Sequence, residues 1–114
     1  MRFMLTMYAS PRVPRPPRQA ESTDWMRDMI AFMTRIDDDL RASGELVADA
    51  GFSEPGFRVT STERHQEPLA DGSPLIGFWL VDVVSEERAV EIARELADWA
   101  GAVEVRRTGE PPAV

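Results

Sequence analysis

The chain has 114 residues, a formal net charge of −7 and 13 basic residues, all of them arginine. This length predicts one domain with its own core, and the acidic balance argues against a general nucleic-acid binder, which needs a basic surface. The chain contains no cysteine and no lysine, which excludes disulfides, thiolate metal sites and catalysis by cysteine or by a lysine Schiff base.

The first expected element is a strand over residues 2–8. Both of its faces are mostly apolar, which predicts a place beside the central strand of a sheet. The same residues are too few for a signal sequence with its cleavage site. No segment approaches the roughly 20 apolar residues that a membrane-spanning helix needs. We therefore expect a cytoplasmic protein with no membrane partner.

A proline- and arginine-rich loop follows at residues 10–21. Its prolines disfavour both a helix and a paired strand, and favour an extended backbone. One interpretation is a solvated loop. Another is a flap whose Arg12, Arg15 and Arg18 meet an anion, and a third is a ligand for a proline-recognition module.

A long amphipathic helix is predicted next, capped by Ser22 or Thr23 and running to about Ala42 before Gly44. Its apolar residues recur by threes and fours, which predicts a face packed in the core. They are Trp25, Met26, Met29, Ile30, Phe32, Met33, Ile36 and Leu40. The three consecutive carboxylates at 37–39 fan around the helix axis and cannot converge on one metal ion, so we expect a solvated face.

Three strands are expected in the middle of the chain. Residues 45–50 predict a short strand and residues 57–66 a more exposed one, and an Asp-Gly pair at 71–72 is typical of the turn that follows. The stretch 74–84 is apolar on both faces apart from Asp82. It therefore predicts the central strand of a sheet, with both faces covered.

The last elements are a second helix and an edge strand. Ser85 caps the helix and Gly101 ends it, and residues 102–107 form a one-sided strand. We expect one domain over residues 1–108 and a tail over 109–114.

The order of these elements predicts an α+β fold. Strand, helix, strand, a further strand, strand, helix and strand is the ferredoxin-like split βαβ plan, in which two helices cover one face of an antiparallel sheet. The other face would be apolar in at least two strands, more than a monomer leaves exposed. We therefore expect an isologous homodimer whose two subunits pack sheet to sheet.

Four segments also carry a resemblance to a known family: FMLTMY at 3–8, DLRASG at 39–44, DGSPLIGFWLVDV at 71–83 and VEVR at 103–106. The chain resembles the YCII-related, or DGPF-domain, proteins over nearly its whole length. The resemblance implies a dimeric α/β barrel of ferredoxin-like subunits. It also implies a small bacterial protein of a group whose members mostly have no assigned function.

Two departures from the family's pattern bear on activity. Ser73 stands inside the Asp-Gly-Pro-Phe motif, and no phenylalanine follows Pro74. The histidine that many members carry on the first helix, where it is proposed as catalytic, falls at Met33. The resemblance therefore implies a His–Asp pair without its histidine, in which Asp71 matches the motif's carboxylate.

Two side chains are candidate catalytic groups, and no zinc spacing, phosphate loop, dinucleotide fingerprint or nucleophile elbow accompanies them. Asp71 could act as a general base in a desolvating cleft, or could serve the turn alone. His65 could transfer protons near neutral pH, or could lie on the surface without a role.

Four further residues are candidate substrate contacts. Tyr8 could place its hydroxyl at a pocket mouth or lie in the core. Arg58 could hold an anionic ligand or pair with a neighbouring carboxylate. Met33 and Trp79 would supply an apolar wall between the sheet and the helices.

Two functions remain open at this point. The first is a cofactor-free lyase or isomerase that transfers protons on a small organic substrate. The second is a non-catalytic dimeric module that binds a small molecule or serves as an accessory subunit. The missing helix histidine favours the second, and the arginine-rich flap favours the first. One histidine is a poor ligand supply, so we expect neither a metal nor another cofactor.

Overall fold

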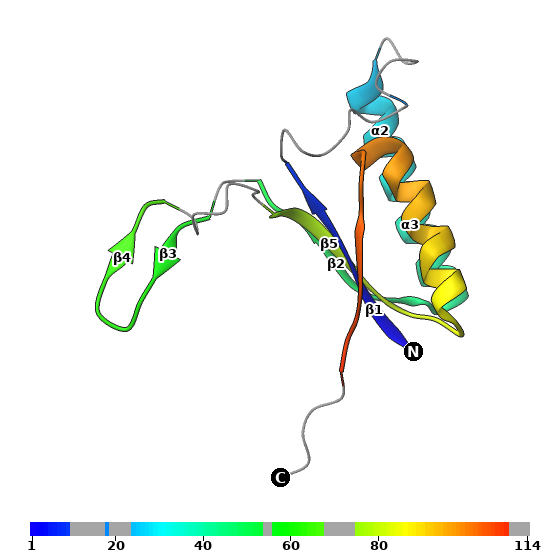
Figure 1. Ribbon diagram of the computed structural model, residues 1–114. Coiled ribbons are helices and arrows are strands. Elements are labelled where there is room, and N and C mark those ends of the chain that lie inside the picture. Colours follow the sequence, from blue (N-terminus) through cyan, green and yellow to red (C-terminus); the bar gives the residue numbers. More distant parts are fainter. Residues whose placement is uncertain (10–17, 19–23, 54–55, 68–74, 110–114) are drawn as a thin grey trace.

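The computed structural model describes residues 1–9, 18, 24–53, 56–67 and 75–109 (Figure 1). Within these residues the chain forms an antiparallel sheet of four strands, two long helices and a separate two-stranded hairpin. The fold is therefore α+β, as the order of the predicted elements indicates.

The sheet has the strand order β2-β5-β1-β6, and all its neighbouring strands are antiparallel. Its strands are β1 (Arg2–Tyr8), β2 (Leu46–Gly51), β5 (Leu75–Asp82) and β6 (Glu104–Arg107). The two strands with two apolar faces, β1 and β5, lie side by side in the middle. The one-sided strand β6 lies at an edge, so these three placements are confirmed.

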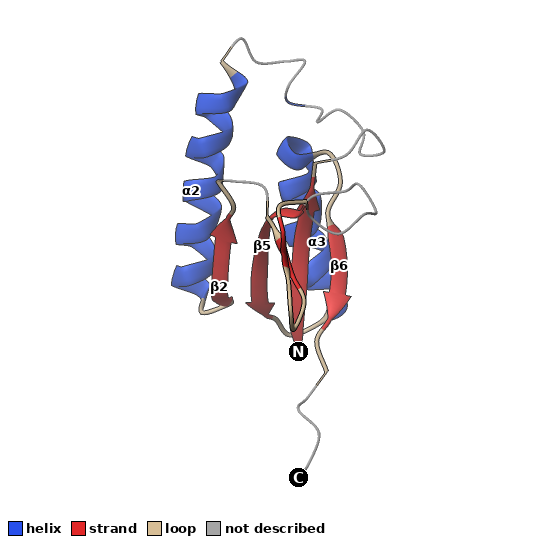
Figure 2. Ribbon diagram, turned by 90° about the vertical axis from the view of Figure 1, so that its left-hand side faces the viewer, coloured by secondary structure: helices blue, strands red, loops and turns tan. Residues whose placement is uncertain are grey.

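Both helices lie against the same face of the sheet (Figures 1 and 2). They are α2 (Trp25–Ser43) and α3 (Glu86–Ala100). Gly44 ends α2 in the left-handed conformation, at φ 77°, and the Ser85 side chain accepts the backbone N–H of Arg88 at the start of α3. The N-cap position of α2 is Asp24, and the predicted caps Ser22 and Thr23 lie outside the described residues.

The core lies between the sheet and the helices. Its buried apolar residues are Phe3 and Leu5 on β1, Ile36 and Leu40 on α2, Trp79 and Val81 on β5, Val83 after it, and Ala89, Ile92, Ala93 and Leu96 on α3. No helix among the described residues is long and apolar enough to cross a membrane.

The predicted packing of α2 is wrong for its N-terminal half. Met26 is 51% exposed and Ile30 is 57% exposed, although both belong to the apolar stripe. Figure 2 shows the reason, because the first turns of α2 extend past the end of β2. The stripe packs against the core from Phe32 and Met33 onward.

Residues 57–66 form a hairpin, which we call the arm, and not the single strand expected from the sequence. Its strands are β3 (Arg58–Val59) and β4 (Arg64–His65). In the turn between them the backbone N–H of Thr60 donates to the Glu63 carbonyl at 2.8 Å, and the Thr60 hydroxyl accepts the Glu63 N–H at 3.0 Å. A threonine that caps its own turn is a weaker sequence signal than the Asp-Gly pair from which the turn at 71–72 was predicted. The expected turn at 71–72 lies outside the described residues.

The second face of the sheet, which we call the open face, is not covered by the helices (Figure 2). Register and alternation place eleven side chains on it. They are Arg2, Met4, Thr6, Ala48, Ala50, Ile76, Phe78, Leu80 and Asp82, with Glu104 and Arg106 on β6. The expectation that both faces of β5 are covered is therefore not met within one chain.

Candidate functional site

The described residues that we predicted as site residues lie in three separate places. Trp79 is 5% exposed in the core, and Met33 packs against the core from α2. Tyr8 ends β1 at a bulge where the register with β5 shifts. Arg58 and His65 lie on the arm.

The contacts of these residues do not form the predicted cleft. Trp79 and Met33 are occupied by packing, and the arm stands away from both (Figure 1). Asp71, the predicted base, lies outside the described residues. The predicted proton-transfer site is therefore not assembled by the part of the chain that the structure describes.

On the arm, His65 lies beside a carboxylate, and Arg58 is its partner in the ladder. The His65 Nε2 lies 3.0 Å from a carboxylate oxygen of Glu63, and Arg58 faces His65 across the ladder. The Arg64 guanidinium lies over the Phe57 ring, 4.1 Å from its centroid. The Nε of Arg58 is buried and finds no acceptor among the described residues. The contact with Glu63 gives His65 a local partner on the arm.

A carboxyl pair that the sequence analysis did not predict lies beside Trp79. The indole Nε1 of Trp79 donates a hydrogen bond to Asp37 Oδ1 at 2.8 Å. Asp49 lies directly opposite Trp79 on β2, and its side chain shares a hydrogen bond with that of Asp37. We call Asp37 and Asp49 the carboxyl pair. Three elements build it: α2 supplies Asp37, β2 supplies Asp49 and β5 supplies the indole.

The carboxyl pair holds a proton at higher pH than ordinary carboxyl groups do. The hydrogen bond to Asp37, partial burial and the negative charge of Asp37 together raise the pKa of Asp49 from 3.8 to about 6, against a smaller opposing effect of Arg41. A carboxyl group held beside another carboxylate keeps its proton to higher pH, because two adjacent negative charges repel each other. Asp49 can therefore donate or accept a proton at a pH of about 6.

The solvated face predicted for residues 37–39 is thus wrong at its first residue. Asp37 is half-buried, whereas Asp38 and Asp39 are exposed. Helical spacing contained the signal, because Asp37 follows Met33 by four residues and precedes Leu40 by three. That spacing places Asp37 at the edge of the apolar stripe, facing the sheet.

A hollow on α3 lies apart from the carboxyl pair and from the arm. This hollow, on the first turns of α3, is lined by Glu86, Glu87, Val90, Glu91 and Arg94, and none of the predicted site residues lines it. Among the described residues, no group of three or more His, Cys, Asp or Glu side chains is arranged to hold a metal ion.

Comparison with known proteins assigns neither a family nor a function to the chain. No protein-family model matches the chain, and no curated protein matches it.

Proposed function

We propose that the chain is a homodimeric module of the YCII-related kind, which binds a small molecule or serves as an accessory subunit. Its two copies would pack through the open face as a dimeric α/β barrel. The observation that carries this proposal is the sheet with helices on one face alone (Figure 2). The strand order β2-β5-β1-β6, with a helix after β1 and another after β5, also fits the ferredoxin-like split βαβ plan.

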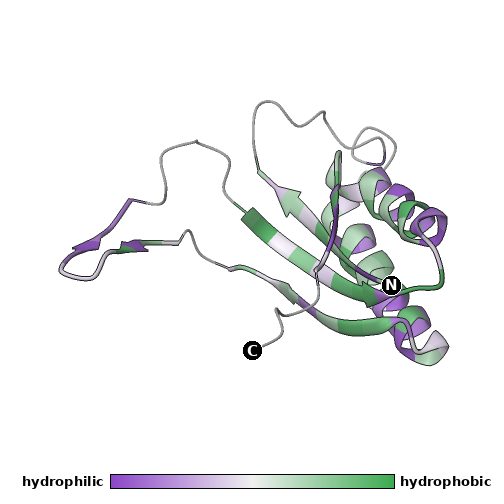
Figure 3. Cartoon of the chain, turned by 60° about the horizontal axis from the view of Figure 1, so that its bottom comes forward, coloured by the Kyte–Doolittle hydropathy of each residue, from purple (hydrophilic) through white to green (hydrophobic). Residues whose placement is uncertain are grey.

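The chemistry of the open face supports a protein partner. Much of the sheet is coloured hydrophobic in Figure 3, and the Phe78 and Phe52 rings lie 6.2 Å apart, centroid to centroid. Glu104 and Arg106 add charge along β6, at the edge of the sheet. An apolar centre with a polar rim is the usual anatomy of an interface, and monomers rarely expose such a patch. A second copy would present the same surface, so the contact would be isologous.

The separation of His65, a predicted catalytic residue, from Trp79, a predicted substrate contact, favours the module over the lyase or isomerase. His65 lies on the arm beside Glu63, and Trp79 is buried and bound to Asp37. A proton-transfer enzyme needs its base within hydrogen-bond reach of a substrate pose. The described residues offer no such pose that includes both His65 and Trp79.

One observation favours the cofactor-free enzyme as a second candidate. Within the carboxyl pair, the pKa of Asp49 is raised to about 6. A group with this property suits general acid–base catalysis. In this second candidate the carboxyl pair would transfer the proton on a small organic substrate.

Oligomeric state tests the first proposal. Native mass spectrometry of the wild-type protein at micromolar concentration should give twice the chain mass of 12.8 kDa. Phe78→Asp places a charge in the centre of the open face and should give a monomer with an unchanged circular dichroism spectrum. Val84→Asp is the matched control, because Val84 is 91% exposed and lies outside the open face, and this variant should remain a dimer. A monomeric wild-type protein would contradict the homodimer.

The same spectra separate the two candidates. Protein purified gently from its own host should carry an extra small-molecule mass if it binds a ligand in that host, whether it is the module or the enzyme. Loss of that mass in Asp49→Asn, with the dimer intact, would favour the carboxyl pair as the reactive site. Retention of the mass in Asp49→Asn would favour the binding module.

A further inference from the structure

The arm lacks the packing that would hold it in place within one chain. Its two strands have two residues each, and no helix or other strand among the described residues packs extensively against them. A two-stranded hairpin alone is marginally stable in water. Phe57 is 53% exposed and Val59 is 66% exposed, so the arm also displays apolar side chains.

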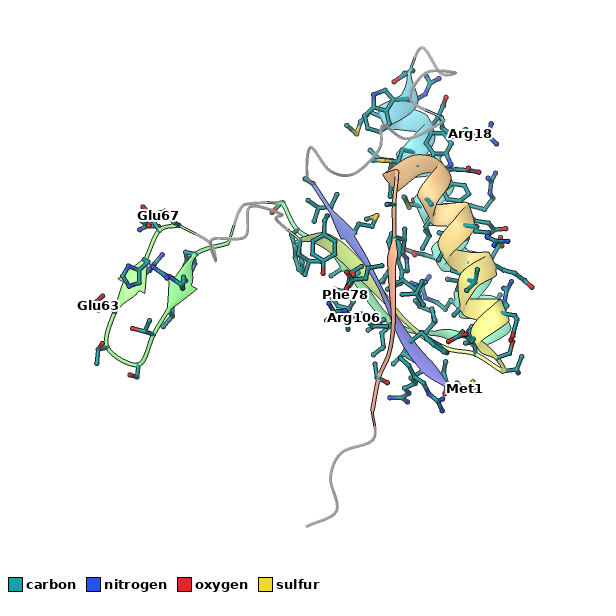
Figure 4. The ribbon with its side chains drawn as sticks, in the orientation of Figure 1. Met1, Arg18, Glu63, Glu67, Phe78 and Arg106 are labelled. Carbon is teal, nitrogen blue, oxygen red and sulfur yellow. The ribbon has the colours of Figure 1, made fainter. Side chains whose placement is uncertain are left out.

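The arm projects on the side of the open face. In Figure 1 the helices lie on one side of the sheet and the arm on the other, and in Figure 2 the arm comes forward of the sheet. In Figure 4 the labelled Phe78 and Arg106 lie on the side of the sheet away from the helices, and Glu63 lies beyond them on the arm. Stacked sheets lie about 10 Å apart. A layer that packs on the open face must therefore lie alongside the arm.

The size of the open face calls for an additional contact. Strand spacing of about 4.8 Å and a rise of about 3.3 Å per residue give a four-stranded face of roughly 450 Å². A stable protein interface buries about 800 Å² on each partner. The sheet alone would supply about half of this area, and an arm that contacts the partner would supply much of the remainder.

We infer that the arm of each copy packs against the sheet and helices of the other copy, with Phe57 and Val59 buried in the contact. This inference rests on the homodimer proposed above. It adds that the arm is part of the interface and that each copy holds the other beside its sheet. The contact is reciprocal, because a two-fold axis applies it twice.

Site-specific cross-linking tests the inference, and the absence of cysteine from the wild-type chain makes a single thiol unique. Val59→Cys would be labelled with a benzophenone maleimide, mixed with ¹⁵N-labelled protein of the same variant, and irradiated. We expect cross-linked peptides that join a heavy chain to a light chain. Glu95→Cys, on the exposed side of α3, is the control and should give no such link.

A second measurement uses affinity. Val59→Asp should raise the dissociation constant of the dimer about tenfold or more, because it places a charge in a buried contact. Val84→Asp carries the same change at another exposed valine and should leave the dissociation constant unchanged.

The outcomes distinguish the two proposals. Heavy-to-light links from position 59, with weaker dimerisation of Val59→Asp, support the arm contact. A dimer whose links from position 59 all stay within one chain, or are absent, overturns the arm contact and leaves the sheet-to-sheet dimer standing. A wild-type protein that is monomeric overturns both.

Discussion

Trp79 and Asp37 lie 42 positions apart in the chain and are joined by a hydrogen bond of 2.8 Å from the indole Nε1 to a carboxylate oxygen. The indole is 5% exposed, so this contact ties α2 to the middle of the sheet from within the core. It also fixes the position of the carboxylate that faces Asp49.

Trp79→Phe tests the contribution of the indole donor. Phenylalanine keeps most of the apolar volume but leaves Asp37 without its donor, so the free energy of unfolding should fall by about 1–2 kcal/mol. Urea unfolding measures this change. Trp99→Phe is the matched control, because the Trp99 ring stacks on Phe32 with centroids 5.6 Å apart and phenylalanine preserves a ring there. Equal losses in the two variants would contradict a specific role for the indole.

The carboxyl pair predicts an unusual dependence of stability on pH. The pKa of Asp49 is raised from 3.8 to about 6, so the folded protein binds this proton more tightly than the unfolded chain does. The resulting stabilisation is complete below pH 3.8 and is lost as the pH rises through about 6. After allowance for partial exposure, this group should lower the free energy of unfolding by about 1 kcal/mol between about pH 5 and about pH 7.5.

Asp49→Asn should remove this part of the pH dependence, because asparagine is neutral at both values. Chemical unfolding at the two pH values measures the difference between variant and wild type. Asp39→Asn, on the exposed side of the same helix as Asp37, is the control and should follow the wild-type profile. A wild-type profile in Asp49→Asn would show that the carboxyl pair does not titrate in this range.

An ion pair joins α3 to Glu45, the residue that precedes β2. Arg88 donates from Nε and from a terminal nitrogen to the two carboxylate oxygens of Glu45, each at 2.9 Å. Arg88→Lys keeps the charge but loses this two-pronged contact, and should cost about 1 kcal/mol at neutral pH. Arg94→Lys on the same helix, at an exposed position, should cost much less.

The loss of stability in Arg88→Lys should become smaller in acid. The stabilisation by protonated Asp49 has the opposite pH dependence and becomes larger in acid. The hydrogen bond from Arg88 lowers the pKa of Glu45 below its ordinary value of 4.5. The stabilisation is therefore fully present above pH 4.5 and is lost as the pH falls through the lower value in the folded protein. Unfolding curves of Arg88→Lys and wild type that stay equally far apart in acid would contradict this account.

Gly77 and Gly51 face each other across β5 and β2 and offer a matched pair of substitutions. A Cβ at Gly77 would lie 3.0 Å from the Ala50 carbonyl oxygen and 3.1 Å from the Met7 methyl group, whereas a Cβ at Gly51 meets nothing within 4 Å. Gly77→Ala should therefore lower the free energy of unfolding by about 1–3 kcal/mol. Gly51→Ala should be close to neutral, and thermal unfolding of both variants checks the contrast.

Local chemistry explains which sequence predictions hold. The left-handed conformation of Gly44 and the capping side chain of Ser85 depend on a few neighbouring residues, and both helix boundaries are confirmed. The two apolar faces of residues 75–82 correctly predict an inner strand. The arm was missed because its turn depends on the Thr60 side chain, which has a weaker signal than Asn-Gly or Asp-Gly.

The sequence by itself determined the α+β class, the inner strands β1 and β5, the end of α2 and the start of α3, because periodicity and capping act over a few residues. Tertiary structure alone decided which carboxylate of residues 37–39 meets the core, that Asp49 stands opposite Trp79, and that the first turns of α2 pass the end of the sheet. These features depend on strand register and on how far each helix extends over its sheet. Both are set by contacts between residues far apart in the chain, such as Asp37 and Trp79.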